Sequence, residues 1–175
     1  MTDDKKLDEL RGWFTGRLPQ GWFEGAPEVT LDREEITVVG RIAAPDVGDG
    51  ASDGERAGAV AGRIAAFREE TRGHRIDVAR EAEHRFGRKV AWGVECAGTR
   101  QLFTTLSVPV MTRLRQPERQ VLDTLISAGV ARSRSDALAW CVRLVATHAG
   151  DWLGDLRSAM ENVDRVRDEG PKPTT

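Results

Sequence analysis

The sequence predicts an α+β protein in which an N-terminal helix and antiparallel strands pack on a long helix, and a helical module follows. Two observations lead to this prediction. Short β-branched runs bounded by turn residues occur within residues 1–108, and apolar residues recur at three- and four-residue steps along 55–86 and again after residue 116. We therefore expect an α+β domain over 1–108, a helical module over 109–168 and a disordered tail over 169–175.

The N-terminal segment is expected to form an amphipathic helix over residues 3–14, because its leucines and its first Phe recur at helical spacing. A Trp-Phe pair occurs in this segment and again nine residues later, as Trp13 with Phe14 and Trp22 with Phe23. These aromatic residues form either an exposed docking patch or a satellite core beneath the helix. Ordinary burial preferences favour the satellite core.

The next elements are two strands, a linker and a long helix. The runs 29–32 and 36–42 are short and rich in β-branched residues, which favours strands. Residues 45–54 contain Gly, Asp and Ser without periodicity and predict a linker. The helix is expected over 55–86, with a bend at Gly73. Its outer face mixes arginines with acidic residues, which predicts solvated ion pairs, with a basic face that follows a nucleic-acid backbone as the alternative.

Two further strands are expected over residues 89–96 and 101–108, joined by a turn at Ala97 and Gly98. The first domain then has the order helix, two strands, long helix, two strands. This order predicts that the strands form one antiparallel sheet packed against the long helix.

The composition indicates a cytoplasmic protein. The N-terminus is charged and lacks the apolar run of a signal peptide, and no segment approaches the length of a membrane span. The two cysteines, Cys96 and Cys141, lie among apolar neighbours. This pattern argues against a disulfide framework and against a cysteine-rich zinc site.

The charges are distributed unevenly along the chain. Residues 1–62 carry seven Lys and Arg against thirteen Asp and Glu, whereas residues 101–149 carry six against three. A basic central region permits a polyanionic partner but does not require one. The pI of about 6.0 is lower than is typical of DNA-binding domains.

No motif for catalysis, a cofactor or a metal occurs in the sequence. The histidines His74, His84 and His148 have no Cys or carboxylate partner at metal-ligand spacing. A Gly-rich phosphate loop, a nucleophile elbow and a zinc-protease motif are all absent. We therefore expect a binding protein without a cofactor, and an enzyme built on the α+β domain is the least favoured hypothesis.

The most informative segment begins at Pro117, a residue suited to the first position of a helix. A narrow apolar stripe follows over residues 121–126, and Gly129 stands where a left-handed helix end is expected. Ser133 with Asp136 three residues later is a variant of the capping box, so a second helix should begin near residue 134.

The apolar stripes of these two helices are too small to bury each other fully, which indicates a partner chain. A third helix is expected from about residue 150, because an apolar stripe continues there. This stripe consists of Trp152, Leu153, Leu156, Met160 and Val163.

The segment resembles the ribbon-helix-helix family of DNA-binding proteins, to which Arc- and MetJ-type repressors belong. The residues that carry the resemblance are 121–125, then Gly129, then 133–138. The resemblance implies a homodimer in which each chain contributes one strand to an antiparallel ribbon that enters the major groove of DNA. It also implies that the amides at the start of the second helix hold a phosphate.

The resemblance places the ribbon strand over residues 108–115. Alternation along it directs Val110, Thr112 and Leu114 inward and Met111, Arg113 and Arg115 outward, so the outward residues are candidates for base contacts. The candidate phosphate anchor consists of Arg132, Ser133, Arg134 and Ser135.

An alternative interpretation makes these arginines a solvated strand end or helix start. Pro109 interrupts the run, although an edge strand tolerates a proline. If residues 111–115 are helical, no ribbon forms and only a helical hairpin remains.

The leading hypothesis from the sequence is therefore a homodimeric DNA-binding protein, either a transcriptional regulator or an antitoxin-like repressor, whose N-terminal part senses a ligand or supports assembly. The alternative is a non-enzymatic interaction or scaffold protein with a helical dimerisation tail. Its contacts would come from Trp13, Trp22, Trp140 and Trp152.

Overall fold

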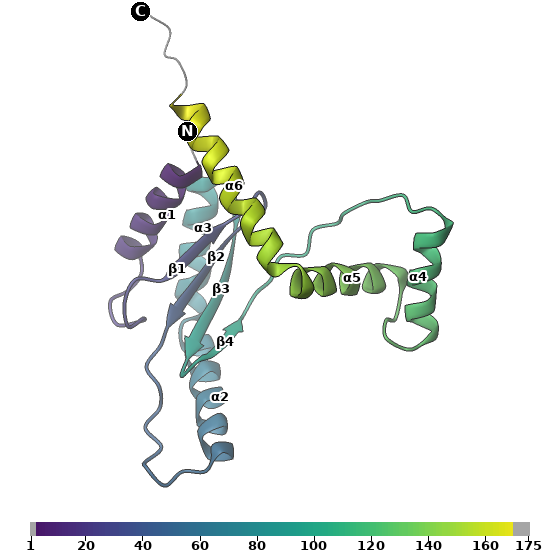
Figure 1. The fold of residues 1–175 in the computed structure, drawn as a ribbon. Coiled ribbons are helices and arrows are strands. Elements are labelled where there is room, and N and C mark those ends of the chain that lie inside the picture. The colour runs from purple at the N-terminus through teal and green to yellow at the C-terminus, as the bar shows by residue number, and fades with distance from the viewer. Residues whose placement is uncertain (1–2, 170–175) are drawn as a thin grey trace, which may run out of the picture. The chain divides into compact units, whose positions relative to one another are not determined.

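The computed structural model describes residues 3–169, and Figure 1 shows its ribbon. The chain divides into two compact units, the first ending at Pro109 and the second beginning at Val110. We call them the N-terminal unit and the C-terminal unit. The tail expected over 169–175 lies outside the described residues from residue 170 onward.

Helices and strands mix as the sequence predicts, so the α+β class is confirmed. The described part of the N-terminal unit contains α1 (Asp3–Arg17), β1 (Glu28–Leu31), β2 (Glu35–Arg41), α2 (Asp53–Glu70), α3 (Arg72–Phe86), β3 (Lys89–Cys96) and β4 (Thr99–Leu102). The C-terminal unit contains α4 (Gln116–Ser127), α5 (Arg134–His148) and α6 (Gly150–Asp168).

The strands form one mixed sheet in the order β1-β2-β3-β4. The outer pairs are antiparallel, whereas β2 and β3 run parallel, in register from Glu35 beside Lys89 to Arg41 beside Glu95. The expectation of a wholly antiparallel sheet is therefore wrong. The helices between β2 and β3 return the chain to the end of the sheet at which β2 begins, so both strands run in the same direction (Figure 1).

One face of the sheet carries the apolar core. Val38 of β2 and Trp92 of β3 pack in one cluster with Phe14 of α1 and Val78 of α3. A second cluster on the same face consists of Ile42, Ile64, Phe67, Val94 and Cys96. The strand residues of the two clusters are separated by even steps, so they share the face that α1, α2 and α3 cover.

Both Trp-Phe pairs pack against these two clusters, so the burial expected of them is confirmed and the docking patch is wrong, but only the first pair lies beneath α1. Trp13 packs with Phe14 in the first cluster, and Trp22 packs with Phe23 against the second. The ring of Trp22 meets the ring of Phe67 edge-on, with their centroids 5.8 Å apart.

The long helix expected over 55–86 is two helices that meet at Thr71. The Thr71 hydroxyl donates to the carbonyl of Phe67 at 2.6 Å, in addition to the Thr71 N–H, which donates to the same carbonyl at 3.1 Å. Hydroxyl groups that bond back in this way bend helices. The break therefore falls two residues before the expected position at Gly73, and the Thr71 hydroxyl bonds back to the end of α2 there.

The turn predicted between β3 and β4 is confirmed. Ala97 and Gly98 have φ angles of +47° and +78°, the backbone that a two-residue hairpin turn requires. The expected strand over 101–108 is wrong beyond Leu102, where β4 ends after pairing with Gly93. The N–H of Phe103 still donates to the carbonyl of Trp92 at 2.7 Å, and the Thr104 hydroxyl accepts the N–H of Trp92 at 3.0 Å, so the chain leaves β3 only after residue 104.

None of the helices between residues 3 and 169 combines the length and the apolar character needed to cross a membrane.

The close approach of a ring to β2 gives a first prediction. A Cβ on Gly40 would lie 2.1 Å from the ring of Phe23, whereas a Cβ on Gly62 in α2 would meet nothing within 4 Å. We expect Gly40→Ala to lower the free energy of unfolding by about 1–3 kcal/mol through overpacking. Gly62→Ala should raise it by about 0.5–1 kcal/mol, because alanine restricts the unfolded chain.

The measurement is urea unfolding of the full chain, followed through NMR signals of the N-terminal unit. If Gly40→Ala is as stable as Gly62→Ala, the ring of Phe23 does not pack on Gly40.

Candidate nucleic-acid interface

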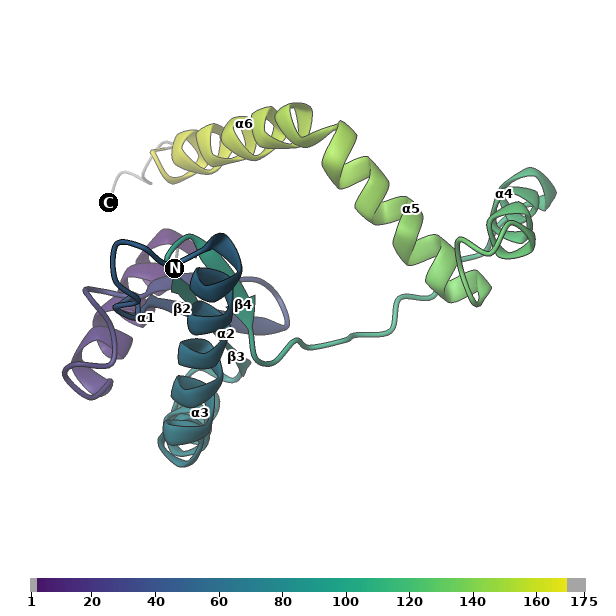
Figure 2. The ribbon, with the colours of Figure 1, turned by 90° about the horizontal axis from the view of Figure 1, so that it is seen from below.

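The segment that precedes α4 is extended and exposed. Residues 104–115 belong to neither a helix nor a strand, and Figure 2 shows them as an irregular trace before α4. Val110 is 85% exposed and Met111 is 98% exposed. The N–H groups of residues 108–115 donate no hydrogen bond to any other described residue. The helical alternative for residues 111–115 is therefore wrong, and the backbone of this segment is free to pair.

The side chains of the segment divide only partly as the alternation predicts. Arg113 and Arg115 are exposed, as expected of outward residues. Leu114 is half-buried and packs against the core of the C-terminal unit, as expected of an inward residue. Val110 and Thr112 are exposed, although the alternation places them on the inward side.

Helix α4 begins directly after this segment. Arg115 is its N-cap residue and has extended φ and ψ angles of −79° and 173°. Pro117 occupies the second helical position rather than the first, where its missing N–H would also lack an intrahelical acceptor. The Arg119 guanidinium donates to the carbonyl of Leu114 at 2.7 Å, which fixes the end of the segment to the helix.

The turn between α4 and α5 ends α4 as the sequence predicts. Gly129 has a φ of +74°, in the left-handed region. Its N–H donates to the carbonyl of Ile126, and the N–H of Val130 donates to the carbonyl of Leu125, each at 3.0 Å. This pair of bonds is the Schellman motif, which satisfies carbonyls at the end of a helix.

The cap of α5 at Ser133 is confirmed. The Ser133 hydroxyl accepts the N–H of Asp136 at 3.2 Å. The Asp136 carboxylate accepts the N–H of Arg132 at 3.0 Å instead of returning to Ser133, so the capping box is not reciprocal. The first amides of α5 remain without intrahelical acceptors, as at any helix start.

The four candidate phosphate-anchor residues differ in their exposure and in the partners that their side chains already have. Arg134 forms a two-bond pair with Asp123 of α4, at 2.8 Å for each bond. This hydrogen bonding lowers the pKa of Asp123 and raises the pKa of Arg134. Arg132 is almost fully exposed and lies 3.8 Å from Asp136. The charge of Arg134 is thus already compensated, and Arg132 and Ser135 are the more accessible groups.

The pair between Arg134 and Asp123 could not be found by sequence reasoning, because eleven residues and a turn separate its members. No hydrogen bond or ion pair joins Arg113 or Arg115 to residues 132–135 within the part of the chain that the structure describes. The structure therefore places the two candidate groups in one unit without a direct contact between them.

The core of the C-terminal unit is small. Its buried members are Leu122, Ala131 and Ala137, with five half-buried neighbours that include Leu114 and Cys141. Many apolar side chains remain exposed: Val110, Met111, Val121, Val130, Val142, Leu144, Val145, Trp152, Leu156, Met160, Val163 and Val166. Exposed apolar surface of this extent is typical of a chain that associates.

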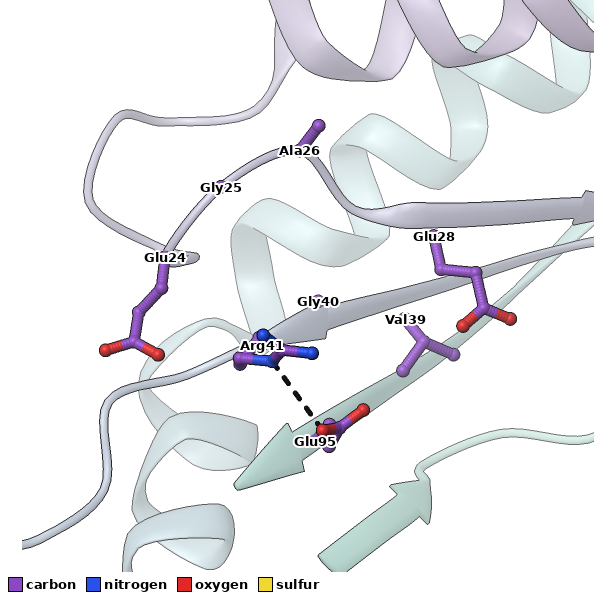
Figure 3. A pocket seen from close by; sticks show the side chains of 8 residues that line it. All are labelled: Glu24, Gly25, Ala26, Glu28, Val39, Gly40, Arg41 and Glu95. Carbon is purple, nitrogen blue, oxygen red and sulfur yellow. Dashed lines mark ion pairs between the residues drawn. The ribbon is translucent and has the colours of Figure 1, made fainter. Parts of the chain in front are cut away.

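A shallow polar pocket lies on the N-terminal unit beside β2 and β3 (Figure 3). Three of its four charged residues are paired within the chain, because Arg41 lies 3.6 Å from Glu95, and Glu28 pairs with Arg100 at 2.8 Å. No cluster of three or more His, Cys, Asp or Glu residues suited to a metal ion occurs among residues 3–169. The Glu24 carboxylate is the one charged group of this lining without a side-chain partner among the described residues, and a single surface carboxylate does not define a site.

Two family models match the chain. The N-terminal domain of Rv1265-like proteins matches residues 8–102, and the Mb1296 C-terminal domain matches residues 115–167. The chain therefore belongs to the family of Rv1265-like proteins. Neither model is a ribbon-helix-helix model, so that resemblance stays a prediction.

Two mycobacterial relatives match across both units. The chain is 58% identical over 159 residues to the protein Rv1265 of Mycobacterium tuberculosis and to the protein Mb1296 of Mycobacterium bovis. Each match covers 91% of this chain and 69% of the relative, and both relatives are named as uncharacterized proteins. No solved structure matches the chain.

The turn before α5 gives a second prediction. An alanine at Gly129 would have to keep a φ of +74°, which should lower the free energy of unfolding of the C-terminal unit by about 1–2 kcal/mol. The matched control is Gly154→Ala in α6, where a Cβ meets nothing within 4 Å and φ is not positive.

The measurement is urea unfolding followed by the NMR signals of Ala131 and Ala137, which lie in the core of this unit. A Gly129→Ala variant no less stable than the control would contradict the Schellman geometry.

Proposed function

We propose that this protein is a homodimeric DNA-binding protein whose C-terminal unit acts as a ribbon-helix-helix module. The observation that carries the proposal is the extended, unpaired segment 108–115, which leads directly into two short helices joined by a glycine turn and a serine cap. In a single chain, a ribbon strand would be extended and unpaired, because each protomer supplies only one of the two strands of the ribbon.

The exposed apolar surface supports association of two copies. An extended segment with free N–H and C=O groups is a template for pairing with another chain. Val110 is almost fully exposed although alternation places it on the inward side, so pairing with a second copy would bury it. Dimerisation would also bury the apolar sides of α4 and α5.

The charges of the unit support a nucleic-acid partner. Arg113 and Arg115 are exposed and pair with no carboxylate among the described residues. On the outward side of a ribbon, their guanidinium groups would be placed for two-bond contacts with guanine. The free amides at the start of α5, with Arg132 and Ser135, would hold a backbone phosphate.

The proposed activity is binding without catalysis, and a DNA partner would place the protein in the cytoplasm. The gene-regulatory role remains part of the same proposal.

The proposal predicts that Arg113→Ala with Arg115→Ala lowers the affinity for specific DNA by at least about tenfold, because each two-bond base contact contributes about 1–3 kcal/mol. The matched control is Arg143→Ala with Arg157→Ala, which removes the same charge from exposed positions on α5 and α6. The measurement is fluorescence anisotropy on genomic DNA fragments across a range of salt concentrations.

Both variants must keep the far-UV circular dichroism of the parent chain. Equal affinities of the two variants for DNA would overturn the assignment of the segment as the reading element.

The dimer itself gives a fourth prediction, which rests on two neighbouring residues. Val110→Glu would place a charge inside the ribbon dimer and should weaken dimerisation by at least about tenfold. Met111→Glu adds the same charge one residue later, on the outward side, and should leave the dimer intact. The measurement is sedimentation equilibrium at several protein concentrations.

The second candidate function is a protein-interaction module, and the apolar side of α6 favours it. Trp152 and Met160 are each 60% exposed on this helix. Trp13 and Trp22 no longer support it, because both pack in the core of the N-terminal unit. If Val110→Glu and Met111→Glu both leave the dimer intact while Trp152→Glu dissociates it, α6 is the interface and the ribbon proposal fails.

A further inference from the structure

The N-terminal unit contains a second cavity, separate from the candidate DNA interface. It has a volume of about 370 Å³ and lies beside α3, β3 and the residues that follow β4. Pockets of about 300–1,000 Å³ are typical of small-molecule sites. Its lining includes Arg68, Arg72, Arg75, Trp92 and Phe103.

A buried guanidinium lies in this lining. Arg75 is only 6% exposed, and it donates through Nε to the Thr71 hydroxyl at 3.0 Å and through Nη2 to the Arg68 carbonyl at 2.6 Å. These bonds hold the side chain at the junction of α2 and α3. Its third nitrogen, Nη1, keeps some solvent contact and donates to no described residue. No described carboxylate lies within ion-pair distance of the group. A buried charge without a counter-charge is costly.

The surroundings make this charge more unfavourable. Burial lowers the pKa of Arg75, and the neighbouring positive charge of Arg68 lowers this pKa further. Arg72 adds a third guanidinium to the lining, and Glu69 is the single acidic residue there. An arginine stays charged in proteins, so the cavity carries a net positive charge.

A second donor in the lining also has no partner. The indole Nε1 of Trp92 is buried, and among the described residues it is the one such side-chain nitrogen or oxygen without a hydrogen bond. Buried polar groups nearly always have partners, so an orphaned donor needs an explanation. The Trp92 indole and the Arg75 guanidinium both only donate, so this side of the cavity suits a hydrogen-bond acceptor.

The rest of the lining is apolar. Ile76, Ala79 and Val90 contribute aliphatic surface, and the Arg75 guanidinium carbon lies 4.8 Å from the centre of the Phe103 ring. Apolar walls with a few convergent polar groups are characteristic of small-molecule sites.

We propose that this cavity binds a small amphiphilic anion, whose phosphate or carboxylate head contacts Arg68, Arg72 and Arg75 and whose apolar body lies against Phe103 and Ile76. The guanidinium fork matches either kind of oxyanion. Sequence reasoning assigned these arginines to a solvated helix face, because nothing in the spacing shows that Arg75 is buried without a carboxylate.

The test uses 1-naphthyl phosphate and 1-naphthylacetate as the two amphiphilic anions. Inorganic phosphate, which lacks the apolar body, and 1-naphthol, which lacks the anionic head, are the control probes. The readout is the NMR signal of the Trp92 indole N–H in the full chain, identified with a Trp92→Phe variant. At least one anionic probe should shift this signal and bind at least about tenfold more tightly than inorganic phosphate and 1-naphthol. Whichever of the two binds more tightly identifies the head group.

The variant is Arg68→Gln with Arg72→Gln, since both side chains are exposed and their loss leaves the buried bonds of Arg75 in place. Its affinity for the better probe should fall at least about tenfold. The charge-matched control, Arg33→Gln with Arg80→Gln, lies outside the lining and should bind as the parent does.

The proposal is overturned if neither anionic probe shifts the Trp92 signal. It is also overturned if the control variant loses as much affinity for the probe as Arg68→Gln with Arg72→Gln does. Loss of DNA affinity in Arg68→Gln with Arg72→Gln, without loss of probe binding, would assign these arginines to a polyanion and overturn it as well. The readout needs no DNA, so this inference and the proposed function fail separately.

Discussion

The parallel pairing of β2 with β3 is the constraint on which the N-terminal unit depends. A parallel pair cannot be closed by a tight turn, so the chain must cross the sheet between the two strands, and α2 and α3 make that crossing. The crossing carries Phe67 and Val78 over the strand residues and so builds the core. It also requires a bend, and the bend at Thr71 directs the Arg75 side chain into the protein.

The C-terminal unit has no comparable crossing that builds a large core. Its helices meet through a core of three small or medium side chains, and α6 adds no buried residue to that core. The capping bonds of Gly129 and Ser133 define where the helices begin and end, but such bonds orient a chain rather than bury apolar surface. The helix ends of this unit are therefore well defined, whereas its core is small, and the proposed dimer would enlarge that core.

Local chemistry could be predicted from the sequence, and long-range pairing could not. The cap at Ser133, the turn at Gly129 and the hairpin at Ala97 each follow from residues within a few positions of one another, and each is confirmed. Strand direction depends on where a helix of many residues returns the chain, which no local pattern encodes. The break at Thr71 could not be predicted from its hydroxyl, because Thr124 and Thr147 bond back in the same way within unbroken helices.

The arginines show why charge counts alone do not locate a site. Arg100 and Arg134 lie in basic stretches of the sequence, yet each is neutralised by a carboxylate that is distant along the chain. Arg75, Arg113 and Arg115 form no ion pair with a described carboxylate. A cation without an internal partner gains more from an external anion than a paired one, because the external anion competes with the partner carboxylate for a paired cation. Arg75 lies in a cavity of one unit, whereas Arg113 and Arg115 lie on an open segment of the other, so the two candidate sites suit ligands of different size: a small anion and an extended polyanion.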